Sequence, residues 1–332
     1  MRDAVTIAEI EVCRARRETM WTGNSYRKFG SMMYVIFFAA VVIPMLLVLG
    51  GLLLWRSISA LDRRRSPVRV QLMNLPGEGL RQRIAKLDQQ LSEFSTLMAV
   101  SGPIFLSLWL LLRISKTGLD WTRIRFGGGD LLFAGALLCL VTWIVWRMIH
   151  HIKARRRAVD GLRAELTVAQ SLAPLTAEGA MVFHDVPGEG YNLDHVVVAQ
   201  GAVFAVETKS RRKPAASGSA SARVRYDNRQ LFFPNGADEK SVEQAAYQAK
   251  WLEKYLRDGG IQNVRVIPVL ALPGWYVERT NPEVRAPVLV NNCSNSTFMM
   301  HEKFGAPIPD TVRKYIARLI MLRYPAAPET NA

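Results

Sequence analysis

The chain has 332 residues, enough for about two or three domains at the usual ~100–200 residues each. It carries 43 lysines and arginines against 28 aspartates and glutamates, and this net charge of +15 favours anionic partners such as nucleic acid or phospholipid head groups. The three cysteines lie far apart without a C-x-x-C pair, which argues against a disulfide framework and against a structural zinc site. We therefore expect the chain to work in a reducing compartment.

The N-terminal half contains stretches that are long and apolar enough to cross a bilayer. Residues 31–55 carry no charge over more than the ~20 residues that a spanning helix needs. Residues 131–149 form a second such run, broken only by Arg147, and residues 97–112 form a shorter one that contains a Ser-Gly-Pro sequence. We expect residues 1–150 to form a helical membrane region with two or three transmembrane helices, in which 97–112 is either a span or a re-entrant or interfacial helix.

The basic residues predict the orientation of these helices. With three spans, the loops on the side of the C-terminal half carry fourteen lysines and arginines, and the loops on the other side carry ten. The positive-inside rule then predicts a multi-pass protein of the inner membrane, with everything after residue 150 in the cytoplasm. The arginine runs 63–65 and 155–157 adjoin the spans, where we expect them to hold the orientation and to contact anionic membrane lipid.

An amphipathic helix is expected over residues 80–94, between the first two apolar segments. Its apolar residues recur at spacings of three and four, with polar and charged residues between them. Such a stripe fits a homo-oligomer in which two copies pair. It fits equally a helix that lies against the membrane or against the soluble domain.

Residues 151–332 have the composition of one compact α/β domain, with short β-branched runs between polar turns and amphipathic helices. A helix is expected over Val159–Pro174, with Glu165 at the edge of its buried face, and a strand over Met181–Asp185. The fold is completed by strands at 264–270 and 287–290 and by a helix at 309–322.

The segment after the first strand predicts a β-hairpin that carries the chemistry. Two apolar runs, Leu193–Ala199 and Ala202–Thr208, flank a Gln-Gly pair, a break of the length and kind found in two-residue hairpin turns. Pairing across this turn places Asp194 directly opposite Glu207, with Lys209 on the same face as Glu207.

Two carboxylates that face each other on a strand pair repel unless a positive group lies between them. A divalent cation is the natural candidate, and an all-oxygen ligand set suits Mg²⁺ or Mn²⁺. The rest of the hairpin is apolar on both faces, so unpaired acids there would be costly. In the alternative interpretation, Glu207 and Lys209 form a solvated pair at a strand end and Asp194 caps a turn.

This region resembles the nuclease-related domain (NERD), a branch of the PD-(D/E)xK restriction-endonuclease-like superfamily, through the run from Asp194-His195 via Gly201-Ala202-Val203-Phe204 to Glu207-Thr208-Lys209. The resemblance covers residues 158–272, and its strongest part is the D…E-x-K core. It implies a domain over residues 158–325 with a restriction-endonuclease-like α/β fold, in which helices flank a central mixed sheet. It also implies a metal-dependent nuclease fold that acts on DNA more than on RNA.

The resemblance adds two further site residues. Glu165 matches the acidic helix position of the family, and it would bind a second metal or hold the first through water. Gln244 matches the glutamine of the helix after the core, and it would position the substrate or the water shell of the metal.

The resulting hypothesis is a membrane-anchored, metal-dependent nuclease that hydrolyses phosphodiester bonds at the cytoplasmic membrane face. Asp194 and Glu207 would hold the Mg²⁺ or Mn²⁺, with the backbone carbonyl of Thr208 as a further ligand. Lys209 would orient the attacking water or neutralise developing negative charge. The alternative is a catalytically weak or inactive module that keeps the nuclease fold and serves as a nucleic-acid-binding or membrane-tethered scaffold.

A basic segment follows the hairpin. Phosphate contacts with little base readout are expected from Arg211, Arg212, Lys213, Arg223 and Arg225. Tyr226 and Phe232-Phe233 are available for stacking on bases. Residues 214–222 form a small-residue stretch, which is either a substrate loop or a tolerated surface excursion.

Overall fold

The computed structural model describes residues 74–117, 127–214 and 222–324, together with single residues and pairs between 50 and 58. The expected span 31–55 therefore lies outside the described residues, apart from residues 50, 51 and 54. Among the described residues, 74–95 and 144–324 belong to one compact unit, and 96–117 and 127–143 belong to a second.

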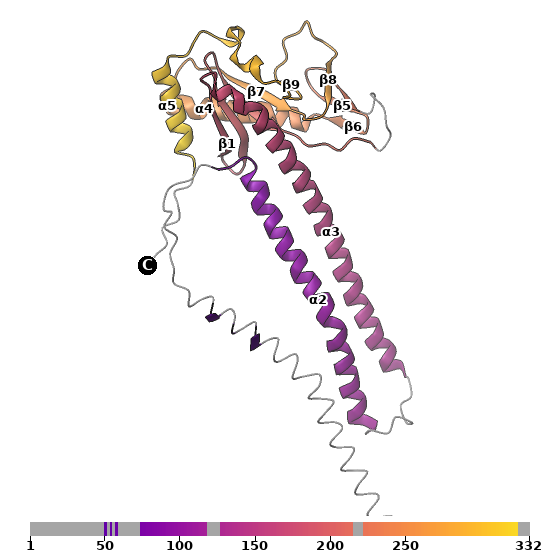
Figure 1. Ribbon diagram of the computed structural model, residues 1–332. Helices are drawn as coiled ribbons and strands as arrows, with labels where there is room; N and C mark the ends of the chain where they lie inside the picture. The colour runs from indigo at the N-terminus through magenta and orange to yellow at the C-terminus, as the bar shows by residue number, and fades with distance from the viewer. Residues whose placement is uncertain are drawn as a thin grey trace, which may run out of the picture. The chain divides into compact units, whose positions relative to one another are not determined.

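Two long helices each contribute residues to both units (Figure 1). Helix α2 (Glu78–Thr117) contains the expected segment 97–112 and continues without interruption through Pro103, and helix α3 (Gly128–Leu172) contains the segment 131–149. Both are long and apolar enough to cross a membrane, and only 6% of the most apolar window of each is buried within the protein. Length and composition make both helices candidate membrane spans, because the core helix of a soluble protein would be mostly buried.

The amphipathic segment 80–94 lies in the N-terminal part of α2 and packs against α3 within the same unit. Asp88 forms an ion pair with Arg155, and the ring centroids of Phe94 and His151 are 5.3 Å apart. The apolar stripe is thus partly covered by the chain's own α3. Pairing of two copies through this stripe stays a prediction.

A five-stranded mixed sheet forms the centre of the C-terminal domain, in the order β1-β2-β3-β7-β9. Strands β1, β7 and β9 of this sheet are labelled in Figure 1. The first three strands are antiparallel neighbours, and β7 and β9 continue the sheet in parallel. The predicted register of the β2–β3 hairpin is confirmed, since Val196 pairs with Ala205 and Val197 pairs with Phe204. The strands are β1 (Met181–Pro187), β2 (Asn192–Val198), β3 (Val203–Thr208), β7 (Val266–Ala271) and β9 (Leu289–Asn291).

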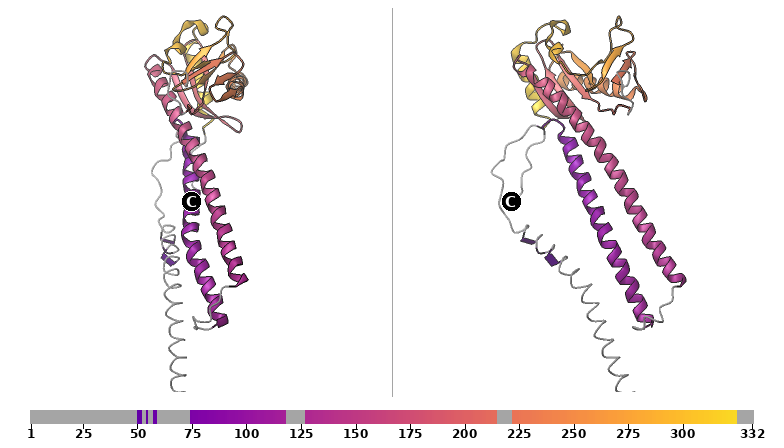
Figure 2. Two further views of the ribbon diagram at one scale, coloured as in Figure 1. Left: turned by 90° about the vertical axis from the view of Figure 1, so that its right-hand side faces the viewer. Right: turned by 45° about the vertical axis from the view of Figure 1, so that its right-hand side comes forward.

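Helices cover both faces of this sheet (Figure 2). One face of β2 and β3 packs on α4 (Lys240–Asp258) and α5 (Asp310–Met321). The other face packs on the end of α3 and on three short 3₁₀ helices, which are η2 (Ala173–Thr176), η4 (Thr297–Met300) and η5 (Glu302–Phe304). The expected α/β architecture with a mixed sheet flanked by helices is confirmed.

A second sheet of four short strands has the order β6-β5-β4-β8. One of its faces is buried against the start of α4 and against Trp275. The strands are β4 (Arg223–Tyr226), β5 (Leu231–Phe233), β6 (Gly236–Asp238) and β8 (Tyr276–Arg279).

The first turn of α2 is joined to the first sheet through Asp185 of β1. The Asp185 carboxylate accepts hydrogen bonds from the backbone N–H of Gly79 at 2.7 Å and from Asn192 Nδ2 at 2.9 Å. Asn74 Nδ2 donates to the Asp185 backbone oxygen at 2.9 Å. A carboxylate at a helix N-terminus satisfies a free N–H group and interacts favourably with the helix dipole. Residues 74–79 are therefore bound to the C-terminal domain, although Gly79 precedes Asp185 by 106 residues in the sequence.

Gly77 is the tightest point of this joint, and Gly77→Ala should destabilise the domain by about 1–2 kcal/mol. Its φ is +72°, and a Cβ atom there would lie 2.4 Å from Leu162 Cδ1 and 3.2 Å from Glu165 Oε2. Thermal unfolding of the full chain in detergent measures the effect. Gly79→Ala is the matched control, because its Cβ would meet Asp185 Oδ2 at an ordinary 3.5 Å. Equal melting temperatures for the two variants would contradict this description of the joint.

Candidate active site

The β2–β3 register brings Asp194 and Glu207 to the same end of the hairpin. The paired residues end at His195 and Val206, and one further step places Asp194 opposite Glu207. Asp194 Oδ2 accepts a hydrogen bond from the Thr208 backbone N–H at 2.6 Å, across the same two strands. The predicted juxtaposition of the two acids is present.

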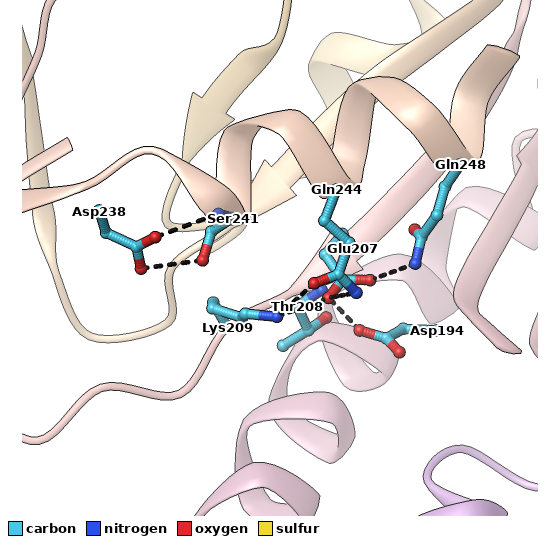
Figure 3. Close-up of polar contacts among 8 residues, drawn as sticks. All are labelled: Asp194, Glu207, Thr208, Lys209, Asp238, Ser241, Gln244 and Gln248. Atoms are coloured by element: carbon cyan, nitrogen blue, oxygen red, sulfur yellow. Dashed lines mark hydrogen bonds and ion pairs between the residues drawn. The ribbon is translucent and has the colours of Figure 1, made fainter. Parts of the chain in front are cut away.

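Glu207 is held by donors from two directions (Figure 3). Its Oε1 accepts hydrogen bonds from Gln244 Nε2 at 2.7 Å and from Lys209 Nζ at 3.0 Å. Its Oε2 accepts one from Gln248 Nε2 at 2.7 Å. The residue is only 3% exposed, so these contacts fix the carboxylate in one orientation between β3 and α4.

Lys209 links the end of β3 to α4. Its Nζ donates to Gln244 Oε1 at 2.8 Å as well as to Glu207. Its backbone N–H donates to the Ala271 oxygen at 2.9 Å, which continues the pairing of β3 with β7. The lysine side chain is 36% exposed, whereas that of Glu207 is 4% exposed. The ammonium group therefore lies between the buried carboxylate and the solvent.

Glu165 of α3 acts on this site through its charge. It is 9% exposed, and it lies beyond the apolar segment 131–149 of its helix. Burial, together with the charges of Asp185 and Glu207, raises the pKa of Glu165 to about 7. Burial and the charges of Glu207 and Glu165 also raise the pKa of Asp194 well above its usual value. These acids repel one another, and a bound cation would relieve that repulsion.

Residues 160–273 match the family model of the nuclease-related domain. This part of the chain is a nuclease-related domain. The match agrees with the resemblance expected over 158–272, and it contains each of the predicted catalytic positions, Glu165, Asp194, Glu207, Lys209 and Gln244. No curated protein and no solved structure matches this chain.

Asp185 is an acid of the nuclease-related domain that the predicted site residues did not include. The β1–β2 register runs on both sides of Asp185 and places it opposite Asp194, so acids from three neighbouring strands lie in one row. Its φ is +48°, and its carboxylate reaches the first turn of α2. A positive φ at a non-glycine residue has no signature in the sequence, so this position could not have been predicted from alternation along β1.

Gln248 is a second residue that the sequence analysis missed. It is 1% exposed, and its Oε1 atom has no hydrogen-bond partner in the part of the chain that the structure describes. Its position four residues after Gln244 places both amides on one face of α4, where both reach Glu207. That spacing was the signal available in the sequence.

The donor atoms of the site fit a hydrated, hard cation. The unpartnered Gln248 Oε1 belongs to the amide that binds Glu207, so an oxygen ligand for water or a cation lies beside the carboxylate. Within the described residues, no group of three or more Asp, Glu, His or Cys side chains is close enough to hold a metal ion. Mg²⁺ often takes only one or two protein carboxylates and keeps several waters. A site at Asp194 and Glu207 would be of this kind, and Glu165 does not join them in a group of three within the described residues.

Three of the five predicted phosphate-binding residues form ion pairs within the domain, one of them Arg223, whose Nη1 atom lies 3.9 Å from Glu278 Oε2. Arg211 hydrogen-bonds Asp238 at 3.4 Å, and Arg212 hydrogen-bonds Asp160 of α3 at 2.6 Å. Lys213 is exposed. These contacts tie the segment after Lys209 to its neighbours, which leaves less of its charge free for phosphate groups.

Arg223 and Arg225 are exposed on β4 of the second sheet. The expectation that Tyr226 and Phe233 are available for stacking is wrong, because these rings are 0% and 7% exposed and point into the core. Phe232, which lies between the buried residues Leu231 and Phe233 on β5, is partly exposed. Residues 215–221, most of the small-residue stretch, lie outside the described residues.

Proposed function

We propose that this protein is a membrane-anchored, metal-dependent nuclease that hydrolyses phosphodiester bonds, in DNA more than in RNA. The observation that carries the proposal is the arrangement of Asp194, Glu207 and Lys209 at one end of β3, held by Gln244 of α4, within a nuclease-related domain. Paired acids beside a partly exposed lysine are suited to phosphoryl chemistry, where charge must be neutralised at the phosphate.

Asp194 and Glu207 would hold Mg²⁺ or Mn²⁺, with the Thr208 carbonyl as a further ligand. When bound, the ion supplies activation of a water and neutralisation of charge at the scissile phosphate. Gln244 keeps Glu207 and Lys209 in register, since its amide hydrogen-bonds both. Lys209 is the exposed member of the group and would contact the attacking water or a phosphate oxygen.

Lys209→Ala should lower turnover by roughly 100-fold to 1,000-fold, the range found when one charge-stabilising donor is removed from an active site. The metal concentration that gives half-maximal activity should change little, because an ammonium group does not coordinate the ion. A metal titration of the cleavage rate separates the two quantities. A large shift in metal requirement with unchanged maximal turnover would contradict the assigned role.

A nuclease assay of the full chain in detergent tests the proposal. The full chain is required because a fragment that starts after residue 150 lacks Gly79 and Asn74, which bind Asp185. We expect cleavage of DNA with Mg²⁺ or Mn²⁺ and none with EDTA. Nucleic-acid binding without cleavage under any of these metals would favour the inactive module instead. The observation that favours the inactive module is that three hydrogen-bond donors already occupy the Glu207 carboxylate.

We also propose that α2 and α3 anchor the protein in the inner membrane, with the nuclease-related domain in the cytoplasm. If both helices cross, residues 74–95 and 144–324 lie on one side, because the chain crosses once in each direction between them. The excess of basic residues in these segments supports the cytoplasmic side.

A reporter that is active only in the periplasm tests this topology. Fused after Ala332, it should be silent. Inserted into the connection 118–126 between the two helices, the same reporter should be active, which controls for expression and folding. The opposite pattern would place the domain in the periplasm and would make chromosomal DNA an implausible substrate.

A further inference from the structure

One face of the second sheet is buried and the other is open. Val224 and Tyr226 of β4 and Leu231 of β5 are each 0% exposed on the inner face. The alternate residues of β4 and β5, together with those of the neighbouring strand β8, point outward. They are Arg223, Arg225, Phe232, Tyr276 and Glu278, and we call this set the outer face.

Strand pairing arranges the outer face in two rows. Arg223 pairs with Tyr276 in the first row. In the second row, Arg225 lies between Phe232 on one side and Glu278 on the other. The two rows are two residues apart along β4, which corresponds to about 7 Å.

Each row places a guanidinium group beside an aromatic ring. The Arg223 Cζ atom lies 5.6 Å from the centroid of the Tyr276 ring, and the Arg225 Cζ atom lies 5.7 Å from that of Phe232. Tyr276 is 61% exposed. Rings and guanidinium planes on an open sheet are the elements on which unpaired bases stack, while arginines also neutralise phosphates.

We propose that the outer face binds a single-stranded segment of nucleic acid, with bases stacked on Tyr276 and Phe232 and phosphates at Arg223 and Arg225. The proposal rests on the proposed nuclease function, and it narrows the substrate class. A duplex keeps its bases stacked on each other, so it cannot use the two rings in the same way. The bound strand would present its unpaired bases to the rings and its backbone to the arginines.

The second sheet adjoins the candidate active site along the chain. Strand β6 leads directly into α4, where the Asp238 carboxylate accepts a hydrogen bond from Ser241 Oγ at 2.9 Å (Figure 3). Arg211, two residues after Lys209, lies 4.3 Å from the ring of Phe233 on the inner face of β5. The segment that follows Lys209 and the start of α4, which carries Gln244, therefore both contact the second sheet.

Glu278 is the charge that opposes phosphate on the outer face. Its Oε2 atom lies 3.9 Å from Arg223 Nη1, and it pairs with Arg225 across the strands. The acid lowers the positive potential of the face. Glu278→Gln should therefore tighten the binding of a single strand by roughly threefold to tenfold, in the direction opposite to the alanine variants of the rings and arginines.

Binding of a short labelled oligonucleotide to the full chain in detergent, with EDTA to prevent cleavage, tests the proposal. Tyr276→Ala and Phe232→Ala should each weaken single-strand binding about tenfold or more, since stacking on a protein ring contributes that much per base. Tyr276→Phe keeps the ring and should bind like the wild type. Tyr315→Ala removes an exposed tyrosine of α5, away from the second sheet, and should have no effect.

The salt dependence separates the rings from the arginines. Arg225→Ala should lower the slope of log affinity against log salt by about 0.7, the value per phosphate contact for single strands. Tyr276→Ala should lower the affinity and leave the slope unchanged. A merely structural role for the sheet would move both quantities, together with the melting temperature of the domain.

The outcomes distinguish this inference from the nuclease proposal. Cleavage of DNA with ring-independent binding would overturn the inference alone. Ring-dependent binding without cleavage under any metal would support the inference and overturn the nuclease activity. Equal binding of duplex and single strand, or loss of binding to anionic lipid vesicles but not to oligonucleotide in the ring variants, would also overturn the inference.

Discussion

Glu207→Ala and Asp194→Ala should each lower metal-dependent cleavage by at least about a thousandfold. Both carboxylates would hold the same ion, so the loss of either removes a ligand that the remaining geometry does not replace. Within the described residues, no third acid is close enough to complete a metal-binding group. Initial rates of DNA cleavage over a range of Mg²⁺ and Mn²⁺ concentrations measure the effect. Full metal-dependent activity in Asp194→Ala would make the assigned metal site wrong.

The same two variants should differ in stability, which separates loss of chemistry from loss of fold. Glu207→Ala leaves the buried Gln248 amide without the carboxylate that it binds at 2.7 Å, which costs about 1–3 kcal/mol. Asp194→Ala removes one of the mutually repelling charges and should raise the melting temperature in EDTA. Glu243→Ala, at an exposed position of α4, serves as a control for both measurements.

The hairpin was the most predictable part of the site. A two-residue Gln-Gly turn favours one register, and the two-residue period of a strand then decides which side chains share a face. The core confirms that alternation, since Val196 and Ala205 pack on α4 whereas Val197 and Phe204 pack on α3. Local geometry was sufficient here because the strands are neighbours in the sequence.

The start of the first domain helix was predicted 31 residues too late. It was expected at Val159, but α3 is one helix from Gly128 to Leu172. The linking residues contain a run of arginines and no proline or glycine until Gly161, so nothing in them ends a helix. A change from apolar to basic composition marks a change of environment, and it does not mark a change of backbone conformation.

Other contacts between distant segments could not be predicted from the periodicity of the sequence. The bond from Gly79 to Asp185 spans 106 residues, and the parallel pairing of β4 with β8 joins strands of four residues separated by α4 and β7. Strands this short have too few residues for alternation to identify them. The burial of Tyr226 and Phe233 follows from that pairing, which is why their availability for stacking was wrongly predicted.

Because the pKa of Glu165 is raised, we expect the free energy of unfolding of the domain to fall as the pH rises. Its pKa is about 7 in the folded domain and near the ordinary 4.5 when unfolded, so the folded state binds more protons between these values. By linkage, the stabilisation by the protonated form is complete below pH 4.5 and is lost as the pH rises to about 7. The full pKa difference corresponds to about 3 kcal/mol. The groups that face Glu165 and raise its pKa are the acids Asp185 and Glu207.

Glu165→Gln should therefore unfold at a higher temperature than the wild type at pH 8 in EDTA, by up to about 3 kcal/mol of unfolding free energy, and should gain nothing at pH 4. Glu253→Gln, an exposed glutamate of α4, should show neither effect and controls for the loss of one charge. Mg²⁺ at pH 8 should stabilise the wild type more than Glu165→Gln, because an ion at Asp194 and Glu207 relieves the repulsion that the variant has already removed. Two results would show that Glu165 does not interact electrostatically with Asp194 and Glu207. One is a wild-type melting temperature that does not change from pH 4 to 8, and the other is an equal stabilisation of both proteins by Mg²⁺.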